Sequence, residues 1–142
     1  MEERDYLKKK IDKLARVMAK MLADLLALKN QGRLAEAIEI TNKALKNEIA
    51  LNVDDLLAIE PGSLIKTLQT EKNFDVEHLE HLANILFLMA DDLWENEPEN
   101  KSGDELYDRC LRLYEYLNKT DSTYSLERHL RIETIKGRID TF

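Results

Sequence analysis

The chain has 142 residues, of which 44% are hydrophobic and 35% are charged, and it contains only four glycines and two prolines. This composition is typical of one all-helical domain with a sizeable core, and it argues against a disordered or β-rich chain. The net charge of −7 argues against a general nucleic-acid binder, because such proteins are more often basic overall.

Charge is unevenly distributed along the chain. Residues 1–20 carry seven basic and four acidic side chains, a net charge of +3, whereas residues 54–108 carry three basic and fifteen acidic ones, a net charge of −12. Residues 21–53 are neutral and residues 109–142 carry +2. We therefore expect the basic ends to lie against the acidic middle, either within one chain or between two copies.

Three features bear on location. The first ten residues, MEERDYLKKK, are charged and lack the apolar segment of a secretory signal. The longest apolar run, Ile85–Ala90, is far too short to span a bilayer. Cys110 is the only cysteine, so no disulfide can form within the chain. These features favour a cytoplasmic protein without a membrane segment.

The first predicted helix runs from about Glu3 to Asn30 and carries a heptad seam. Its apolar residues are spaced alternately by four and by three, at Leu7, Ile11, Leu14, Met18, Met21, Leu25 and Leu28. Such a seam is typical of a coiled coil. Ala15, Val17 and Leu22 make the apolar face wider than a two-stranded zipper requires. The helix therefore packs inside a bundle, or it also pairs with a second copy.

A second predicted helix runs from Leu34 to Ala50, after a turn at Gly32 that we expect to be left-handed. With about 17 residues against about 28, it is too short to cover the first turns of the preceding helix. Leu7, Ile11 and Leu14 are then exposed unless the terminal helix or another chain covers them. We expect an interaction surface there, and a homodimer is the leading arrangement.

One or two short helices are predicted in segment 51–73. The next helix begins after the N-cap Asp75 and continues to about Glu95; its apolar residues cover about half of its circumference, which predicts a central position. Ser102 and Glu105 have the spacing of a capping box, which predicts where the following helix begins.

The last predicted helix runs from about Ser122 to Ile139. Its apolar residues change sides, with Leu126 and Leu130 on one side, and this pattern predicts an edge helix that touches two surfaces.

The predicted plan is a single all-α domain, 1–142, of antiparallel helical hairpins with about six helices. It consists of a first hairpin (1–50), a short helical insert (51–73), a second hairpin (74–119) and a terminal helix (120–142).

The segment QGRLAEAIEITNKAL resembles the second half of a tetratricopeptide repeat. Gly32 takes the turn position, Leu34 the large residue, and Ala37 and Ala44 the two close-packing positions. The segment DELYDRCLRLYEYL (104–117) is a weaker echo of the same pattern. The whole plan is also similar to a group of small uncharacterised bacterial proteins, for which the resemblance implies no known activity.

Tetratricopeptide repeats usually bind peptide segments in a concave groove. The resemblance therefore implies a protein–protein interaction module or scaffold with an unknown protein or peptide partner, without a cofactor and without enzymatic activity. One subgroup of these repeats holds a C-terminal carboxylate with Lys and Asn side chains on the first helix of a hairpin. The matching positions here are Leu22 and Leu26, so that binding mode is not implied.

The candidate interaction residues lie on the first helix and among the aromatic residues of the second hairpin. They are Leu7, Lys10, Ile11, Leu14, Arg16, Trp94, Tyr107 and Tyr114. The aromatic residues either line a peptide groove or belong to the core. The basic residues of the first helix form a solvated face, or they bind an acidic partner such as the acidic region of a second copy, or more remotely a nucleic-acid backbone.

His78 and His81 offer a rival function, that of a metal-dependent helical-bundle enzyme. They lie three residues apart beside several carboxylates in the segment DVEHLEH. The chain has no second helix with a matching carboxylate–His pair, so a solvated cluster in the first helical turn is favoured. Replacing both histidines by Gln is then expected to leave the fold nearly intact. Cys110 lies on an apolar face and is interpreted as a core thiol.

Overall fold

The structure is a computed structural model in which residues 2–139 are described. These residues form seven α-helices and one short 3-10 helix, with no strand among them, so the predicted all-α class is confirmed. Residues 1 and 140–142, which the predicted domain includes, lie outside the described part. The elements are α1 (Glu2–Asn30), α2 (Leu34–Ile49), α3 (Val53–Ala58), η1 (Pro61–Ser63), α4 (Leu64–Glu71), α5 (Val76–Asn96), α6 (Lys101–Thr120) and α7 (Leu126–Ile139).

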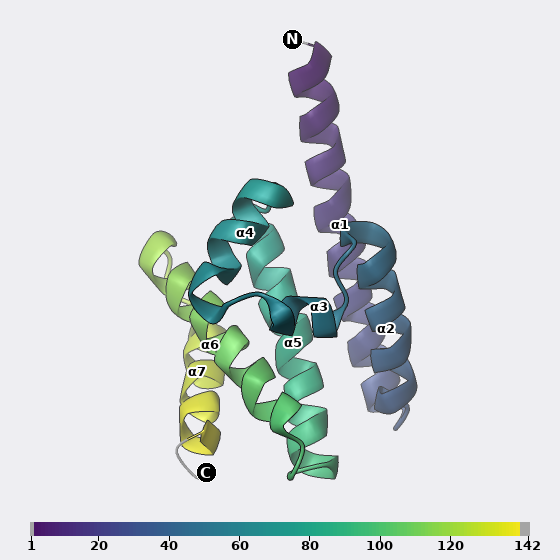
Figure 1. Cartoon of the computed structure of the whole chain (residues 1–142), viewed down its shortest axis with the longest axis vertical. Coiled ribbons are helices and arrows are strands. Elements are labelled where there is room, and N and C mark those ends of the chain that lie inside the picture. The colour runs from purple at the N-terminus through teal and green to yellow at the C-terminus, as the bar shows by residue number, and fades with distance from the viewer. Residues whose placement is uncertain (1, 140–142) are drawn as a thin grey trace.

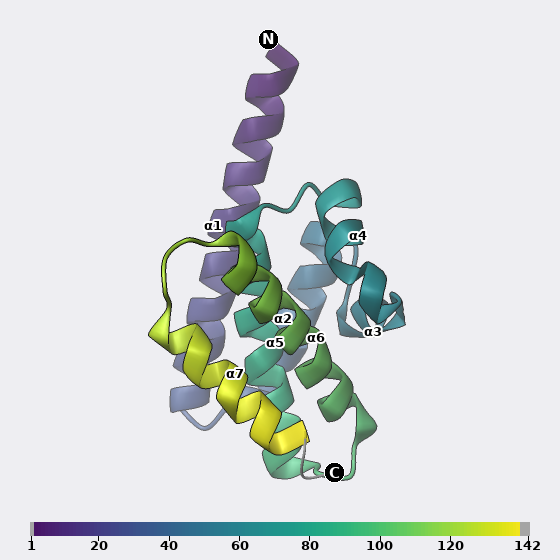
Figure 2. The same cartoon turned by 90° about the vertical axis from the view of Figure 1, so that its left-hand side faces the viewer.

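Helix α5 is the centre of the bundle, as the breadth of its apolar face predicted. It packs against α1 and α6 and also contacts α2, and every residue of Ile85–Ala90 is buried. In Figures 1 and 2, α1 runs antiparallel to α2, and α5 runs antiparallel to α6. The short helices α3 and α4 lie between these two pairs in the chain and cover one face of the bundle, while α7 packs on α6.

The turn between α1 and α2 depends on Gly32. Its φ is +73°, which confirms the predicted left-handed conformation. The N–H of Arg33 donates to the carbonyl oxygen of Leu28 at 2.8 Å, and the N–H of Gly32 donates to that of Lys29 at 3.0 Å. These two bonds form a Schellman motif, which pairs the last carbonyls of α1 and turns the chain back into α2.

Gly32→Val should lower the free energy of unfolding by about 1–3 kcal/mol, because a β-branched residue is strained at a left-handed φ. Lack of space is not the cause, since a Cβ at Gly32 would meet no atom within 4 Å. Urea unfolding followed by circular dichroism would measure the change. Gly62→Ala is the matched control, because Gly62 has no left-handed φ, and its effect should stay below about 1 kcal/mol. Equal effects of the two substitutions would contradict the prediction.

Helix α6 begins earlier than predicted. Its N-cap is Asn100, whose side-chain oxygen accepts a hydrogen bond from the N–H of Ser102 at 2.9 Å, so the predicted capping box of Ser102 and Glu105 is wrong. Asn is as effective an N-cap as Ser. Gly103 is buried in the first turn, where a Cβ would lie 3.4 Å from the Cβ of Leu93. Gly103 therefore lies inside α6, at a point where the helix comes close to α5.

Helix α7 is held against α5 and α6 by arginines. The buried Arg128 lies 3.3 Å from Asp121, just after α6, and 3.4 Å from Glu80 of α5. Arg131 and Arg138 also reach polar side chains of both helices. The expected contact between a basic end and the acidic middle of the chain is therefore confirmed for the C-terminal end.

Helix α7 contacts both α5 and α6, but it does so with one face, so the predicted contact through a second apolar side is not made. Ile132 and Ile135 are buried, whereas Leu126 and Leu130 are 60% and 57% exposed. Only one face of α7 meets the bundle, because the arginines direct that face toward α5 and α6 and leave the two leucines on the opposite side.

Candidate functional site

The first half of α1 extends beyond the rest of the protein. We call Glu3–Leu14 the N-terminal arm; it rises above the body in Figures 1 and 2. Every described side chain before Ile11 is exposed, and Leu7 is 43% exposed. Further along the same heptad seam, Met18 and Leu25 are buried. The seam therefore belongs to the core in its second half and is open in its first half.

The lengths of the helices explain this exposure. Helix α1 has 29 residues and α2 has 16, a difference of about 20 Å at a rise of 1.5 Å per residue. Helix α7 does not cover the arm, because it packs on α6 away from it. The expectation that α2 leaves the first turns of α1 uncovered is thus confirmed: Leu7 is exposed, while Ile11 and Leu14 are half-buried.

A hollow of about 400 Å³ lies where the arm leaves the body. The arm contributes Leu7, Ile11 and Leu14 to it, and the opposite wall is formed by the end of α2 and by Glu71–Asn73. Apolar side chains of the arm therefore face an open space that this chain does not fill.

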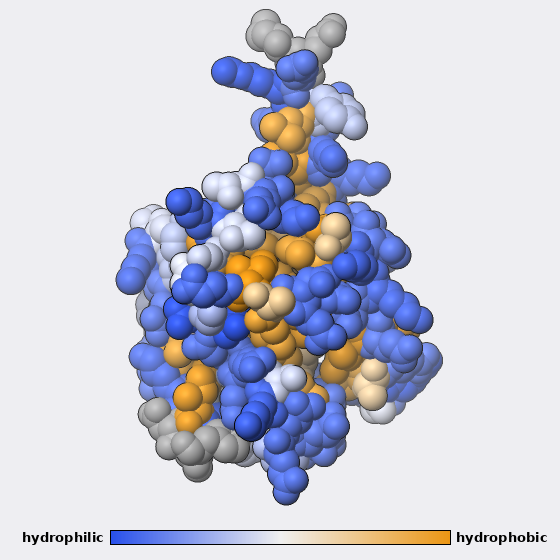
Figure 3. Space-filling view, viewed as in Figure 1, coloured by the Kyte–Doolittle hydropathy of each residue, from blue (hydrophilic) through white to orange (hydrophobic). Residues whose placement is uncertain are grey.

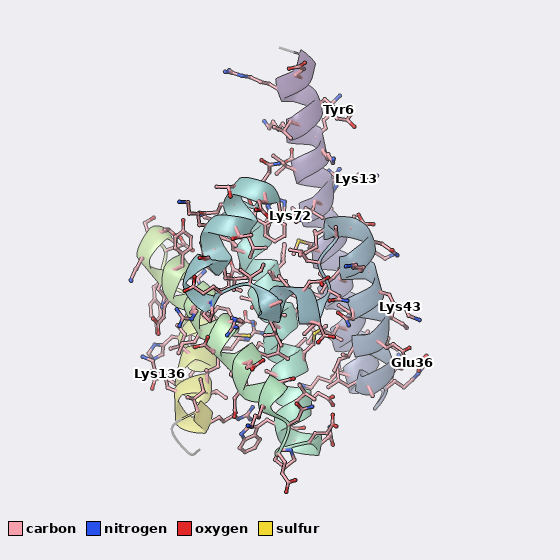
Figure 4. The ribbon with its side chains drawn as sticks, viewed as in Figure 1. Tyr6, Lys13, Glu36, Lys43, Lys72 and Lys136 are labelled. Carbon is pink, nitrogen blue, oxygen red and sulfur yellow. The ribbon has the colours of Figure 1, made fainter. Side chains whose placement is uncertain are left out.

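The arm also carries positive charge that is not paired. Lys8, Lys9, Lys10 and Lys13 are exposed, and none of them forms an ion pair with another described residue. Arg16, one turn further on, is exposed as well. Figure 4 shows Lys13, with Tyr6 above it, on the part of α1 that stands clear of the body. The predicted interaction residues of the first helix therefore share one accessible segment.

His78 fixes the base of the arm. Its ring is fully buried and stacks on Phe74, with 5.2 Å between the ring centroids. Nε2 donates its hydrogen to the carbonyl oxygen of Ile11, 2.9 Å away, because a carbonyl oxygen can only accept. Nδ1 accepts from the N–H of Asp75 at 3.0 Å, within the capping box that begins α5. Asp75 is thus the N-cap that the sequence predicted.

The interpretation of His78 as a solvated residue is wrong, because its side chain is fully buried, and this removes the reason for expecting its replacement to leave the fold nearly intact. Its position in the first turn of α5 suggested exposure, but α1 lies over this turn. His81 remains partly exposed, with Nε2 3.6 Å from Glu77. Among residues 2–139, no three His, Cys, Asp or Glu side chains are grouped as a metal ion would require.

The aromatic candidates do not form a groove. Tyr107 and Tyr114 are buried, so their assignment to an interaction surface is wrong and their alternative interpretation as core residues holds. Trp94 is half-buried beneath the guanidinium of Arg138, whose Cζ lies 4.4 Å from the ring centroid. Helix α7 covers all three, because its arginines bind the polar groups around them.

Tyr107 and Tyr114 occupy equivalent positions in two polar clusters. The corresponding residues of the two clusters are seven positions apart in the chain. The hydroxyl of Tyr114 donates to the side-chain oxygen of Asn84 at 2.6 Å, and that of Tyr107 donates to Asp91. Arg131 also donates to Asn84, and Arg138 donates to Asp91. Each cluster therefore joins α5, α6 and α7.

Burial raises the pKa of both phenols. For Tyr107, the loss of hydration is the main cause, and the hydrogen bond to the Asp91 carboxylate adds to it. For Tyr114, burial is again the main cause. Burial also raises the pKa of Cys110, whose Sγ lies 3.6 Å from the carbonyl oxygen of Ala83. Its interpretation as a core thiol is confirmed by its complete burial.

A second hollow, of about 330 Å³, lies between α2, α3, α5 and α6, and the sequence did not reveal it. We call it the α2–α6 groove. Its apolar floor consists of Ile38, Val53, Leu57, Met89, Leu93 and Leu106. Its charged lining residues are Asp54, Asp92 and Glu97, all acidic. None of these three carboxylates forms an ion pair with a described residue.

Helix α3 holds the groove open by binding both of its walls. The N–H of Val53 donates to the side-chain oxygen of Asn42 on α2 at 2.8 Å. At the other end of α3, the guanidinium of the buried Arg109 on α6 donates to the carbonyl oxygen of Leu57 at 3.2 Å. Hydrogen bonds from α3 to α2 and α6 therefore join the walls of the groove.

Comparison with known protein families, with curated proteins and with solved structures yields no match. Within the described residues, no helix has the length and apolar character needed to cross a membrane.

Proposed function

We propose that this chain is a cytoplasmic protein–protein interaction module without enzymatic activity, and that its N-terminal arm is the binding element, with a second copy of the chain as a partner. The observation that carries the proposal is the open half of the heptad seam. Single exposed leucines are ordinary, but a row of apolar residues beside an unfilled hollow is typical of an interface. Leu7, Ile11 and Leu14 form such a row.

The arrangement of the hairpins supports a tetratricopeptide-like plan. Two antiparallel pairs, α1–α2 and α5–α6, are separated by the short helices α3 and α4 and followed by α7. Proteins of that plan present helix surfaces and grooves to peptides and to other proteins. An arm that continues a core helix beyond its partner is suited to this role, because the helix is already formed before it binds.

The available apolar area limits the affinity. Complete burial of Leu7, Ile11 and Leu14 would contribute about 1 kcal/mol each, since they are already partly covered. A micromolar complex requires about 8 kcal/mol. One arm therefore cannot hold a dimer alone, and a two-fold arrangement in which both arms are buried is favoured. Two buried arms together contribute about 6 kcal/mol, so we expect a dissociation constant of roughly 10–100 μM.

Leu7→Glu/Ile11→Glu should convert a dimer into a folded monomer, because it places two carboxylates in the apolar seam. Light scattering at concentrations up to roughly 100 μM would measure the mass, and circular dichroism would verify the fold. Leu126→Glu/Leu130→Glu is the matched control: it makes the same change at two exposed leucines of α7, and it should leave the dimer unchanged.

A wild type that remains monomeric over the whole concentration range would overturn the proposed homodimer. If that monomer also bound nucleic acid with a steep salt dependence, the arm's lysines would be assigned to phosphate groups.

A further inference from the structure

We propose that the α2–α6 groove is the acceptor for the arm of a second copy, so that two chains exchange their arms reciprocally. This inference rests on the proposed function, because it names the place where the arm of a homodimer is bound. The occupant is a basic amphipathic helix with apolar residues at positions 7, 11 and 14. A groove with an apolar floor between acidic rims is the complementary surface for such a helix.

The arm and the groove carry opposite charges. The arm has Lys8, Lys9, Lys10 and Lys13 exposed and unpaired among the described residues, and the charged residues that line the groove are all acidic. Arg128 and Arg138 of α7 already pair with Glu80 and Asp91 of α5 in their own chain. The four lysines of the arm, by contrast, have no acidic partner among the described residues. Opposite charges at the rim of an interface select the partner and fix its register.

The hollow at the base of the arm is a poorer acceptor. Lys10, Lys13 and Lys72 all line it, against Glu48 and Glu71. A second arm placed there would bring its own lysines against these lysines, and like charges in contact disfavour a complex. The apolar residues of the arm could find cover in the hollow, but its lysines would be repelled. Charge therefore distinguishes the two hollows.

The placement of the two surfaces permits reciprocal exchange. Figure 3 shows hydrophobic residues on the arm and, lower on the same face, between α2 and the centre of the molecule. A second copy that is inverted and faces the first would bring each arm toward the other's groove. The resulting contact is two-fold symmetric and closed, so it produces a dimer and not a filament. The groove also has a size that suits a few inserted side chains, at the lower end of the range for binding pockets, about 300–1,000 Å³.

A charge-exchange experiment on the full chain tests this arrangement. Lys10→Glu/Lys13→Glu reverses the charge of two residues of the arm. Asp54→Lys/Glu97→Lys reverses the charge of two exposed residues at the rim of the groove. Each variant alone should self-associate at least about tenfold more weakly than the wild type, since like charges then meet in both contacts. An equimolar mixture of the two variants should form a dimer again, because each reversed arm then faces a groove of opposite charge. Analytical ultracentrifugation of each variant and of the mixture would measure both effects.

Glu115→Lys/Glu133→Lys is the matched control. It makes the same change of net charge at two exposed residues that do not line the groove, and it should dimerise as the wild type does. A wild-type dimer that persists in the groove variant would overturn the inference while the arm-mediated homodimer stands. A mixture that remains monomeric would overturn the reciprocal exchange. A monomeric wild type would instead refute the proposed homodimer itself.

Discussion

His78→Ala should lower the free energy of unfolding by about 3 kcal/mol. The ring is fully buried and lies against Phe74, so its removal leaves a cavity next to the core. The substitution also removes the hydrogen bond from Nε2 to the carbonyl oxygen of Ile11, which contributes about 1 kcal/mol. Because this bond joins α5 to the base of the arm, amide hydrogen exchange in the following turn of α1, residues 12–15, should become faster.

Two further variants separate the causes of this loss. His81→Gln is the matched control; His81 is partly exposed and one turn away, and its replacement should change stability by less than about 0.5 kcal/mol. His78→Gln retains a donor but not the ring, so its effect should lie between those of His78→Ala and His81→Gln. Urea unfolding would give all three values. Equal stability of His78→Ala and His81→Gln would mean that neither the buried ring nor its hydrogen bond to Ile11 stabilises the fold.

The sequence predicted local features of the fold better than long-range ones. The turn at Gly32 and the cap at Asp75 were predicted correctly, because each depends on one residue type and its near neighbours. His78 was interpreted wrongly because its burial depends on Ile11, 67 positions away in the chain. Periodicity reports which face of a helix is apolar, but it does not show which other helix covers the first turn.

The candidate site also has one part that could be predicted from the sequence and one that could not. The exposed arm could be predicted by comparing the lengths of two neighbouring helices. The α2–α6 groove could not be predicted, because four helices form it and two of its walls are joined by the contacts Asn42–Val53 and Arg109–Leu57. For the tyrosines at 107 and 114, the sequence left groove and core open, and the choice depended on the position of α7.

Alkaline pH should destabilise the protein strongly, by roughly 5 kcal/mol between pH 8 and pH 11. Three buried acids have a raised pKa in the folded state, namely Cys110, Tyr107 and Tyr114. The thiol ordinarily titrates near pH 9 and the phenols near pH 10. Above those values the unfolded chain loses a proton that the folded chain retains. Each group then lowers the free energy of unfolding by about 1.4 kcal/mol per pH unit.

The free energy of unfolding falls with rising pH because the pKa of all three groups is higher in the folded state than in the unfolded state. Below pH 9 both states keep these protons, so the three groups add no pH dependence; above it, the unfolded state binds fewer protons and stability falls as pH rises. Urea unfolding at pH 8, 9, 10 and 11 would measure the slope. Tyr107→Phe/Tyr114→Phe should be less stable at pH 8, because Asp91 and Asn84 each lose a donor. Its slope above pH 10 should nevertheless be shallower than that of the wild type by about 2.7 kcal/mol per pH unit, the share of two phenols. An unchanged slope would assign the alkaline loss of stability to groups other than these tyrosines.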